Sequence, residues 1–397
     1  MILNAIPENV KDFLLEIEKL GFRLCLVGGA VRNVLSGIAI GNDLDFEVRF
    51  KSEVTDLDWP EKFQLISKLA ADKNLKYENL PYLIIRIFLA DYSLEFSSPR
   101  VENFHENNHH HHNFEAFLSS NLNFKEAFKR RDFTINAIGA ELDLAANRFQ
   151  YVDPFNGQAA LKAKILEKIS DDFFYDSVRF IRLVRFKTNL DFEISPAILG
   201  NINKFNLTKI SDYHFKQEAK KSDIGKFFNE FIELVQNNQM QLSARLKFIE
   251  NIKFKFPKRN IINFEHLIYF TFFQDETIAN EFIEFFQYPK NYFSKLTKLK
   301  LAITYFNNLS YDDFYKKLEM PLIEFKNSIE FTHLKVILDY LNMFEQLLQY
   351  TSTANYISIK NLNQLKLFKL DDIIRNQQPP ELRSVMEMQE GLKNVFK

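Results

Sequence analysis

The stretch from Leu24 to Phe50 constrains the fold more than any other part of the chain. Its sequence, LCLVGGAVRNVLSGIAIGNDLDFEVRF, predicts a strand, a glycine turn, a short helix beginning near Ala30, a connector and a second strand. Asp43 and Asp45 lie two residues apart in this second strand. Because side chains alternate along a strand, both carboxylates should leave the same face of the sheet, which suits a shared divalent cation.

Gly28 and Gly29 directly follow the first of these strands. Bare backbone N–H groups and a helix N-terminus at this point can face an anion. The pattern is neither a Walker loop nor a dinucleotide fingerprint, since the latter needs a third glycine where this chain has Asn33. A double glycine alone is usually a turn, and a lone Asp-x-Asp is often a solvated strand end. A phosphate site beside a metal site, however, indicates nucleotide chemistry.

Length and composition predict a protein of two to four domains that works inside the cell. The chain has 397 residues, enough for a sizeable core. Its single cysteine, Cys25, excludes an internal disulfide framework and a Cys-rich zinc site, and is typical of a reducing compartment. The N-terminal segment is acidic and amphipathic, unlike a signal peptide, and no apolar run reaches transmembrane length. We therefore expect a cytoplasmic protein with no membrane contact.

Charge is distributed unevenly along the chain. Residues 1–150 contain 17 Lys and Arg and 22 Asp and Glu, whereas the remainder contains 34 and 30. This asymmetry places a polyanionic partner more naturally on the C-terminal part. Residues 200–397 contain few Gly or Pro and many apolar positions at helical spacing, which predicts an all-helical region. Lysine clusters there, such as the one from Lys290 to Lys300, could contact a nucleic-acid backbone or could simply be solvated surface.

The segments after Phe50 predict a helix at residues 61–74 and strands at residues 82–89 and 93–97. Glu95 falls inside the last of these strands. Its side chain could point outward into solvent. It could equally serve as a third acid, if this strand neighbours the one that carries the paired aspartates.

Residues 101–123 lack periodicity and are expected to form a loop. Its four histidines, His109 to His112, could bind a metal adventitiously or belong to a tolerated insertion, because four adjacent histidines cannot converge on one ion. The following segment, RRDFTINAIGAEL at residues 130–142, is expected to be helical. Its basic residues could contact phosphates, and Asp132 could accept a hydrogen bond from a ribose hydroxyl.

Charged residues recur every third position in the segment FYDSVRFIRLVRF, at Asp176, Arg179, Arg182 and Arg185. One interpretation is an exposed, salt-bridged helix face. The other is a partly buried cleft, because apolar residues surround these charges and buried charges must find partners.

Several motifs, in order, resemble those of the class II tRNA nucleotidyltransferase/poly(A) polymerase family. They are LVGGAVRN at 26–33, DLDF at 43–46, a Glu95 strand ending at Arg100, RRDFTINAIGA at 130–140, VDPFNG at 152–157 and YDSVRFIRLVRF at 175–186. The resemblance covers about the first half of the chain. It implies an α+β protein with a nucleotidyltransferase-fold head, a mixed sheet with helices, followed by all-helical neck, body and tail domains. We place the head at residues 1–145, the nucleotide-selecting neck at 146–220 and the RNA-binding body and tail at 221–397.

The resemblance also implies roles for individual residues. Asp43 and Asp45 would be catalytic ligands of Mg²⁺, with Glu95 as a candidate third acid. Gly28, Gly29 and Arg32 would contact the triphosphate, Arg131 and Asp132 the ribose and phosphates, and Asp176 and Arg179 the base. The remaining candidate nucleotide-binding residues are Asn136, Arg182 and Arg185. The chain departs from the family at Asn33, where Asp is usual, and at Tyr175, where Glu is usual, and its loop after Arg100 is longer and rich in histidine.

The function implied is template-independent addition of C and A nucleotides to the 3′ end of tRNA, from CTP and ATP, with release of pyrophosphate. A poly(A) polymerase or a partial CC- or A-adding enzyme is the nearest alternative, because such enzymes share the head motifs. A non-catalytic RNA-binding relative is a third possibility. The aspartate pair argues against it, while Asn33 and Tyr175 keep it open. The oligomeric state does not follow from the sequence.

Overall fold

A computed structural model of the chain describes residues 2–104, 114–257, 261–308 and 327–340, with a few single residues between 313 and 343. The His109–His112 tetrad lies outside the described residues. The chain divides into two compact units. The first unit comprises Met1–Asp223 and Glu230–Ala244, and the second comprises Ile224–Asn229 and Arg245–Lys397. The domain boundaries expected at residues 145 and 220 stay a prediction.

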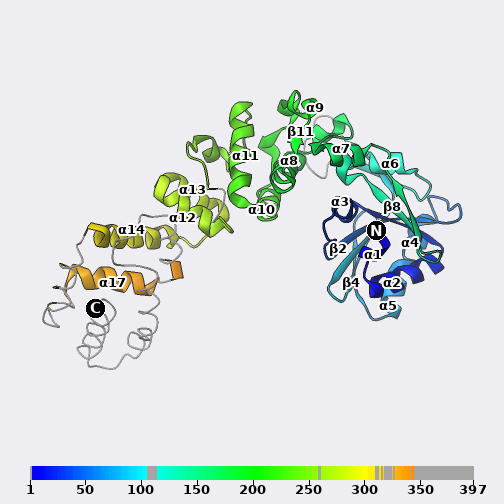
Figure 1. Cartoon of the computed structure of the whole chain (residues 1–397), viewed down its shortest axis with the longest axis horizontal. Helices are drawn as coiled ribbons and strands as arrows, with labels where there is room; N and C mark the ends of the chain where they lie inside the picture. Colours follow the sequence, from blue (N-terminus) through cyan, green and yellow to red (C-terminus); the bar gives the residue numbers. More distant parts are fainter. Residues whose placement is uncertain are drawn as a thin grey trace. The chain divides into compact units, whose positions relative to one another are not determined.

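A seven-stranded sheet in the order β3-β4-β5-β2-β1-β8-β9 forms the centre of the first unit (Figure 1). Its strands are β1 (Phe22–Val27), β2 (Asp43–Phe50), β3 (Lys76–Leu80), β4 (Ile84–Leu89), β5 (Tyr92–Ser97), β8 (Gly139–Asp143) and β9 (Arg148–Val152). Strands β2 and β5 are parallel, and the other neighbouring pairs are antiparallel. The mixed sheet expected for the head is therefore present.

Five helices and the apolar face of this sheet form the main core. The helices are α1 (Ile2–Ala5), α2 (Glu8–Lys19), α3 (Gly29–Leu35), α4 (Trp59–Phe63) and α5 (Leu65–Asp72). On β2, the side chains in this core are Leu44, Phe46 and Val48. Because side chains alternate along a strand, the intervening Asp43 and Asp45 point to the opposite face. The core thus fixes the face on which the paired acids lie.

The opposite face carries helix α6 (Phe124–Phe128) and the short 3₁₀ turn η1 (Thr134–Asn136). The helix expected at residues 130–142 is wrong, since η1 leads directly into β8, which pairs with β1. Spacing alone did not reveal this, because the apolar residues of the segment fit a helical period. Tertiary packing decides it. A Cβ at Gly139 would lie 2.6 Å from Cys25 Sγ, so glycine allows β8 to lie against its neighbours here.

The loop expected over residues 101–123 is also wrong in part. Strands β6 (Arg100–Phe104) and β7 (Phe114–Leu118) form an antiparallel ribbon. On β7, Glu115 and Phe117 are exposed, so the ribbon does not bury one face completely. A strand that is not half-buried lacks clear apolar alternation, which is the signal that sequence reading depends on.

The chain beyond β9 is mostly helical in its described residues. In the first unit, this part contains α7 (Gly157–Ala163), η2 (Asp171–Tyr175), α8 (Ser177–Leu190), α9 (Pro196–Leu199), η3 (Ile202–Lys204), η4 (Leu207–Lys209), α10 (Asp212–Lys220) and the two-residue parallel strands β10 (Ile165–Leu166) and β11 (Glu193–Ile194). Helix α11 (Ile224–Asn237) contributes to both units. The second unit adds η5 (Lys247–Asn251), α12 (Phe264–Gln274), α13 (Glu276–Phe286), α14 (Tyr292–Asn308) and α17 (Ile329–Asp339). The expected α+β class is confirmed.

No helix in the described part of the chain is both long enough and apolar enough to cross a membrane.

Candidate active site

Three acidic residues lie together where β2 and β5 run side by side. Asp43 and Asp45 lie at the beginning of β2, and the parallel register places Glu95 of β5 directly opposite Asp45. The structure thus brings Glu95 to the paired aspartates, which the sequence had left open. Glu95 also forms an ion pair with Arg86 of β4, at 2.9 Å between Nη2 and Oε2.

The surroundings of Asp45 disfavour its ionised form, and its pKa shows this. This pKa is raised to about 6, chiefly by desolvation in the surrounding protein. The charges of Glu95 and Asp43 add to the effect, whereas the charge of Arg131 opposes it. Solvent still reaches the Asp45 side chain, so a ligand could also reach it. Crowded carboxylates of this kind favour a cation.

The donor set fits Mg²⁺. This ion prefers oxygen ligands and is usually held by one or two carboxylates, with substrate phosphates and water completing its shell. Asp43 and Asp45 supply such carboxylates from one strand face. Among the described residues, no three His, Cys, Asp or Glu side chains are grouped so that together they could hold a metal ion. An open site of two carboxylates therefore suits magnesium bound together with a nucleotide.

Gly28 leaves space beside the acids. It has φ of +73°, a conformation that glycine adopts without strain, and it immediately precedes α3. A Cβ at this position would lie 3.6 Å from both Asp45 Oδ2 and Arg131 Nη1. The backbone turn at Gly28 thus lies between a carboxylate and a guanidinium, where a larger side chain would fill the gap.

A chain of hydrogen bonds joins three further candidate residues to helix α8. Arg32 Nη1 donates to Asn136 Oδ1 at 2.7 Å, and Asn136 Nδ2 donates to Asp132 Oδ1 at 3.0 Å. The other oxygen of Asp132 accepts from Arg182, with distances of 2.7 Å to Nε and 2.6 Å to Nη2. Arg131 joins the same group, because its Nη1 donates to the Asn136 carbonyl at 3.3 Å. These five candidates therefore form one connected network.

Asp132 remains ionised in this network although it is buried. Burial alone would raise its pKa. The Arg182 charge and hydrogen bonds from Asn136 and the Phe133 N–H outweigh burial and lower the pKa to about 2. A carboxylate held in this way is a fixed hydrogen-bond acceptor at neutral pH.

Arg185 extends the network to a residue that sequence reading missed, Glu218 of α10. Arg185 Nε lies 2.6 Å from Glu218 Oε2, and Arg182 Nη1 lies 4.0 Å from Oε1. Glu218 shares the buried side of α10 with Phe215 and Ala219. The sequence signal that could have revealed Glu218 is its helical spacing from Phe215 and Ala219, which places an acid on an apolar helix face.

Three guanidinium groups surround one aromatic ring. The Cζ atoms of Arg32, Arg182 and Arg185 lie 5.2, 5.4 and 4.2 Å from the centroid of the Phe186 ring. Burial lowers the pKa of Arg185 to about 10, with the Arg182 charge as a further cause. Arginines that lie close together and are partly removed from solvent can bind an anionic ligand such as a triphosphate.

Asp176 and Arg179 lie together at the beginning of α8. Asp176 is its N-cap and accepts from the Val178 N–H at 2.8 Å. Its Oδ2 lies 3.9 Å from Arg179 Nε. Arg179 also donates to the carbonyls of Arg130 and Asp172, at 2.8 and 3.3 Å. Both side chains are buried, which agrees with the interpretation of this stripe as partly buried and disagrees with an exposed helix face.

Comparison with known proteins agrees with this geometry. Residues 24–167 match the family described as Poly A polymerase head domain. The CCA-adding enzyme of Francisella tularensis subsp. tularensis (strain FSC 198) is 28% identical over 355 residues, which cover 87% of this chain and 84% of that protein. Residues 24–167 therefore form a Poly A polymerase head domain. The resemblance drawn from the motifs is confirmed.

Solved structures of CCA-adding enzymes share the fold of this nucleotidyltransferase. One, described as the complex of CCA-adding enzyme with CTP, gives a TM-score of 0.58 at 17% identity and covers all of this chain and 93% of that chain. Another, the Bacillus stearothermophilus CCA-adding enzyme in complex with CTP, gives 0.55 at 16% identity and covers 98% and 94%. In this nucleotidyltransferase, the acids and Asp132 fall inside the matched head, whereas Asp176 and Arg182 lie beyond it.

Proposed function

We propose that this protein adds C and A nucleotides to the 3′ end of tRNA, from CTP and ATP, and releases pyrophosphate. This proposal rests mainly on one observation. Asp43 and Asp45 share a strand face, Glu95 lies opposite Asp45, and a partly buried network of arginines lies beside them. Similarity to CCA-adding enzymes over most of the chain supports the choice of reaction. We place this activity in the cytoplasm, as the single cysteine favours.

In this proposal the head residues bind and orient the two substrates. The terminal 3′-hydroxyl loses its proton to solvent, its oxygen bonds to the α-phosphorus of the nucleotide, the bond from that phosphorus to the bridging oxygen breaks, and pyrophosphate leaves. Mg²⁺ bound at Asp43 and Asp45 would lower the pKa of the 3′-hydroxyl and neutralise charge on the phosphates. Arg32 and Arg131 would orient the triphosphate beside the Gly28 turn. Asp132, fixed as an acceptor, would hold a ribose hydroxyl.

The test uses purified protein and three tRNA substrates, ending before CCA, after the first C and after CC. Each is incubated with CTP, ATP, UTP or GTP singly and in combination. The proposal expects two C additions, then one A addition, and no further growth. A long A tract would indicate a poly(A) polymerase, and arrest after CC a partial enzyme. Tight RNA binding without incorporation would indicate a non-catalytic relative.

We further propose that Asp176 and Arg179 select the base. Cytosine and adenine present an amine donor beside a ring-nitrogen acceptor, whereas uracil and guanine present a carbonyl beside an N–H. A carboxylate accepts and a guanidinium donates, so one protein pair suits C and A and opposes U and G on both bonds. A buried mismatch costs about 1–3 kcal/mol per unpaired group. Tyr175 in place of the family's Glu is expected to loosen this selection.

We expect Asp176→Asn and Arg179→Gln each to admit UTP or GTP, because an amide can both donate and accept. Asn is as good an N-cap as Asp, so the first variant keeps the cap of α8. Competition assays with all four nucleotides measure the preference. The matched control is Asp275→Asn at the N-cap of α13, which should leave it unchanged. Unaltered preference for CTP and ATP in both variants would place base choice elsewhere, for example in Arg182.

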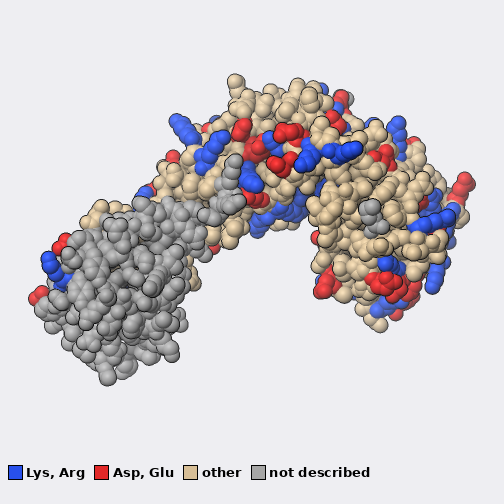
Figure 2. Space-filling view, in the orientation of Figure 1, with Lys and Arg blue, Asp and Glu red and all other residues tan. Residues whose placement is uncertain are grey.

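RNA affinity should depend steeply on salt, because phosphate contacts release counterions. Basic and acidic side chains are interspersed on the coloured part of the face drawn in Figure 2, and we assign the phosphate contacts to the lysine cluster from Lys290 to Lys300. Lys290 and Lys298 are exposed in the second unit. We expect Lys290→Gln/Lys298→Gln to reduce the slope of log affinity against log salt by about 1–2.

The control for this measurement is Lys62→Gln/Lys68→Gln, two exposed lysines on the helices that cover the sheet in the first unit. It should leave the slope unchanged in tRNA titrations at several salt concentrations. If the two double lysine variants reduced the slope equally, the proposal that the helical second unit binds the RNA would be contradicted.

A further inference from the structure

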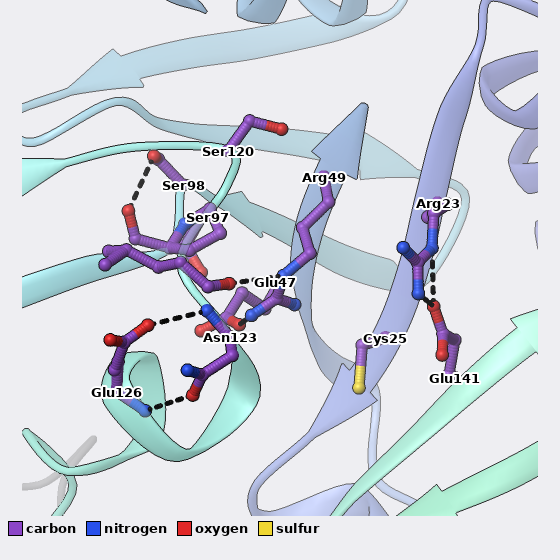
Figure 3. Close-up of polar contacts among 12 residues, drawn as sticks. Arg23, Cys25, Glu47, Arg49, Ser97, Ser98, Ser120, Asn123, Glu126 and Glu141 are labelled. Carbon is purple, nitrogen blue, oxygen red and sulfur yellow. Dashed lines mark hydrogen bonds and ion pairs between the residues drawn. The ribbon is translucent and has the colours of Figure 1, made fainter. Parts of the chain in front are cut away.

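A buried ion pair lies on the same face of β2 as the catalytic aspartates. Glu47 is fully buried, and the Arg49 side chain is 6% exposed, with 2.7 Å between Oε1 and Nη2 (Figure 3). Removing two charges from water costs so much that an apolar pair of similar volume is often at least as stable. Stability alone is therefore a weak explanation for these two residues.

Arg49 connects β2 to the beginning of helix α6. Its Nε donates to the Leu122 carbonyl at 3.1 Å, and its Cζ lies 3.8 Å from the centroid of the Phe124 ring. One residue further along β2, the Phe50 N–H donates to Ser120 Oγ at 2.8 Å. The end of the catalytic strand thus holds the segment that leads into α6.

Helix α6 connects this contact to the nucleotide-binding candidates. A capping box closes its first turn, with reciprocal 2.9 Å hydrogen bonds between Asn123 and Glu126 (Figure 3). At its other end, the Phe128 carbonyl accepts from the Arg131 N–H at 3.0 Å. The Arg131 guanidinium lies over the Phe128 ring, at 4.9 Å from its centroid. A shift of α6 would therefore move Arg131, whose charge acts on Asp45.

We propose that Glu47 and Arg49 are positioning residues for nucleotide transfer. Glu47 orients the Arg49 guanidinium, Arg49 fixes the beginning of α6, and α6 places Arg131 beside Asp45. This inference rests on the proposed function, which assigns Arg131 to the nucleotide. The proposal explains why a charged pair, whose burial costs free energy, lies on the same strand face as Asp43 and Asp45.

The decisive variant is Glu47→Met/Arg49→Met, which removes both charges together, so that neither is left buried without a partner. Arg49→Lys tests whether charge alone suffices, since lysine lacks the planar group that bonds Leu122 and stacks on Phe124. The matched control is Arg23→Met/Glu141→Met. It removes a more exposed ion pair of 2.5 Å between β1 and β8 of the same sheet (Figure 3). Each protein is assayed for Tm, for kcat and KM with CTP on tRNA, and for amide hydrogen exchange over residues 122–132.

We expect the double methionine variant to keep the Tm of the wild type while kcat falls about 100-fold, as displacement of a positioning group can cause. Hydrogen exchange over residues 122–132 should become faster. Arg49→Lys should recover part of the activity, and the control should match the wild type. Wild-type kcat and exchange in the double variant, or an equal loss in the control, would overturn the proposal.

Failure of the proposed function has a different signature. If the wild type incorporates no nucleotide into any tRNA substrate, the proposed function is refuted. The exchange measurement then still decides whether Glu47 and Arg49 fix α6, because it requires no activity. Unchanged exchange in the double variant refutes this positioning, and faster exchange supports it.

Discussion

Asp45→Asn should reduce nucleotide incorporation by about 1,000-fold or more, since a lost metal carboxylate removes several kcal/mol of transition-state stabilisation and each 1.36 kcal/mol is a factor of ten. The fold should not suffer. The raised pKa of Asp45, about 6, means that desolvation and, to a lesser extent, the charges of Glu95 and Asp43 disfavour its ionised form. A carboxyl with a raised folded-state pKa destabilises the protein increasingly as pH rises from about 4 to 6. In metal-free buffer at pH 7, the Asn variant should therefore melt at or above the wild-type temperature.

Thermal melts with and without Mg²⁺ complete this test, together with incorporation assays. Added Mg²⁺ should raise the Tm of the wild type, because a ligand that binds the folded state stabilises it, and should raise that of Asp45→Asn much less. Asp91→Ala, at an exposed position between β4 and β5, is the acidic control and should behave as the wild type. Metal-dependent incorporation at the wild-type rate by Asp45→Asn would exclude the proposed site.

Arg182→Met should destabilise the protein by about 3–5 kcal/mol, because it leaves the buried Asp132 carboxylate without its cation. It should also lower kcat/KM for CTP, since Asp132 holds Asn136 and, through it, Arg32. Asp132→Asn should cost less stability than Arg182→Met, because the amide carries no charge. Chemical denaturation and steady-state kinetics measure both effects.

The dependence on pH follows from the depressed pKa of Asp132, about 2. The stabilisation is fully present above the unfolded value of about 4, and is lost as pH falls towards 2. Asp132→Asn should therefore be less sensitive to acid than the wild type. The control is Arg148→Met, which breaks an Arg–Asp pair of the same 2.7 Å length in solvent and should leave the Tm nearly unchanged. Equal destabilisation by both arginine variants would contradict the importance of burial.

Local sequence patterns were sufficient for the core of the head. Alternation along Asp43–Phe50 placed the aspartates on one face, and the structure agrees because Leu44, Phe46 and Val48 fill the core on the other face. The N-terminal segment, expected to be amphipathic, forms helix α2 (Glu8–Lys19), whose apolar residues pack in the core. These predictions succeeded because each element buries a complete apolar face, which leaves a period in the sequence.

Local patterns failed where burial and spacing give conflicting signals. Segment 130–142 contains apolar residues at a helical period, yet its second half pairs as β8 with β1. On β7 the exposed positions carry both Glu115 and Phe117, so apolar and polar residues are not separated between the two faces of the ribbon. In the first case the distant strand β1 supplies the hydrogen bonds that decide the conformation, and local propensity does not record a distant partner.

The sequence by itself determined the resemblance to tRNA nucleotidyltransferases, the α+β class, the face shared by Asp43 and Asp45, and the set of charged residues available to a nucleotide. Only the tertiary structure decided which charges meet. It placed Glu95 opposite Asp45, joined Asp132 to Arg182 and Arg185 to Glu218, and paired Glu47 with Arg49. The physical reason is that strand and helix periods fix only the side of an element on which a residue lies. Contacts between residues far apart in the chain depend on strand register and on the packing of elements against one another.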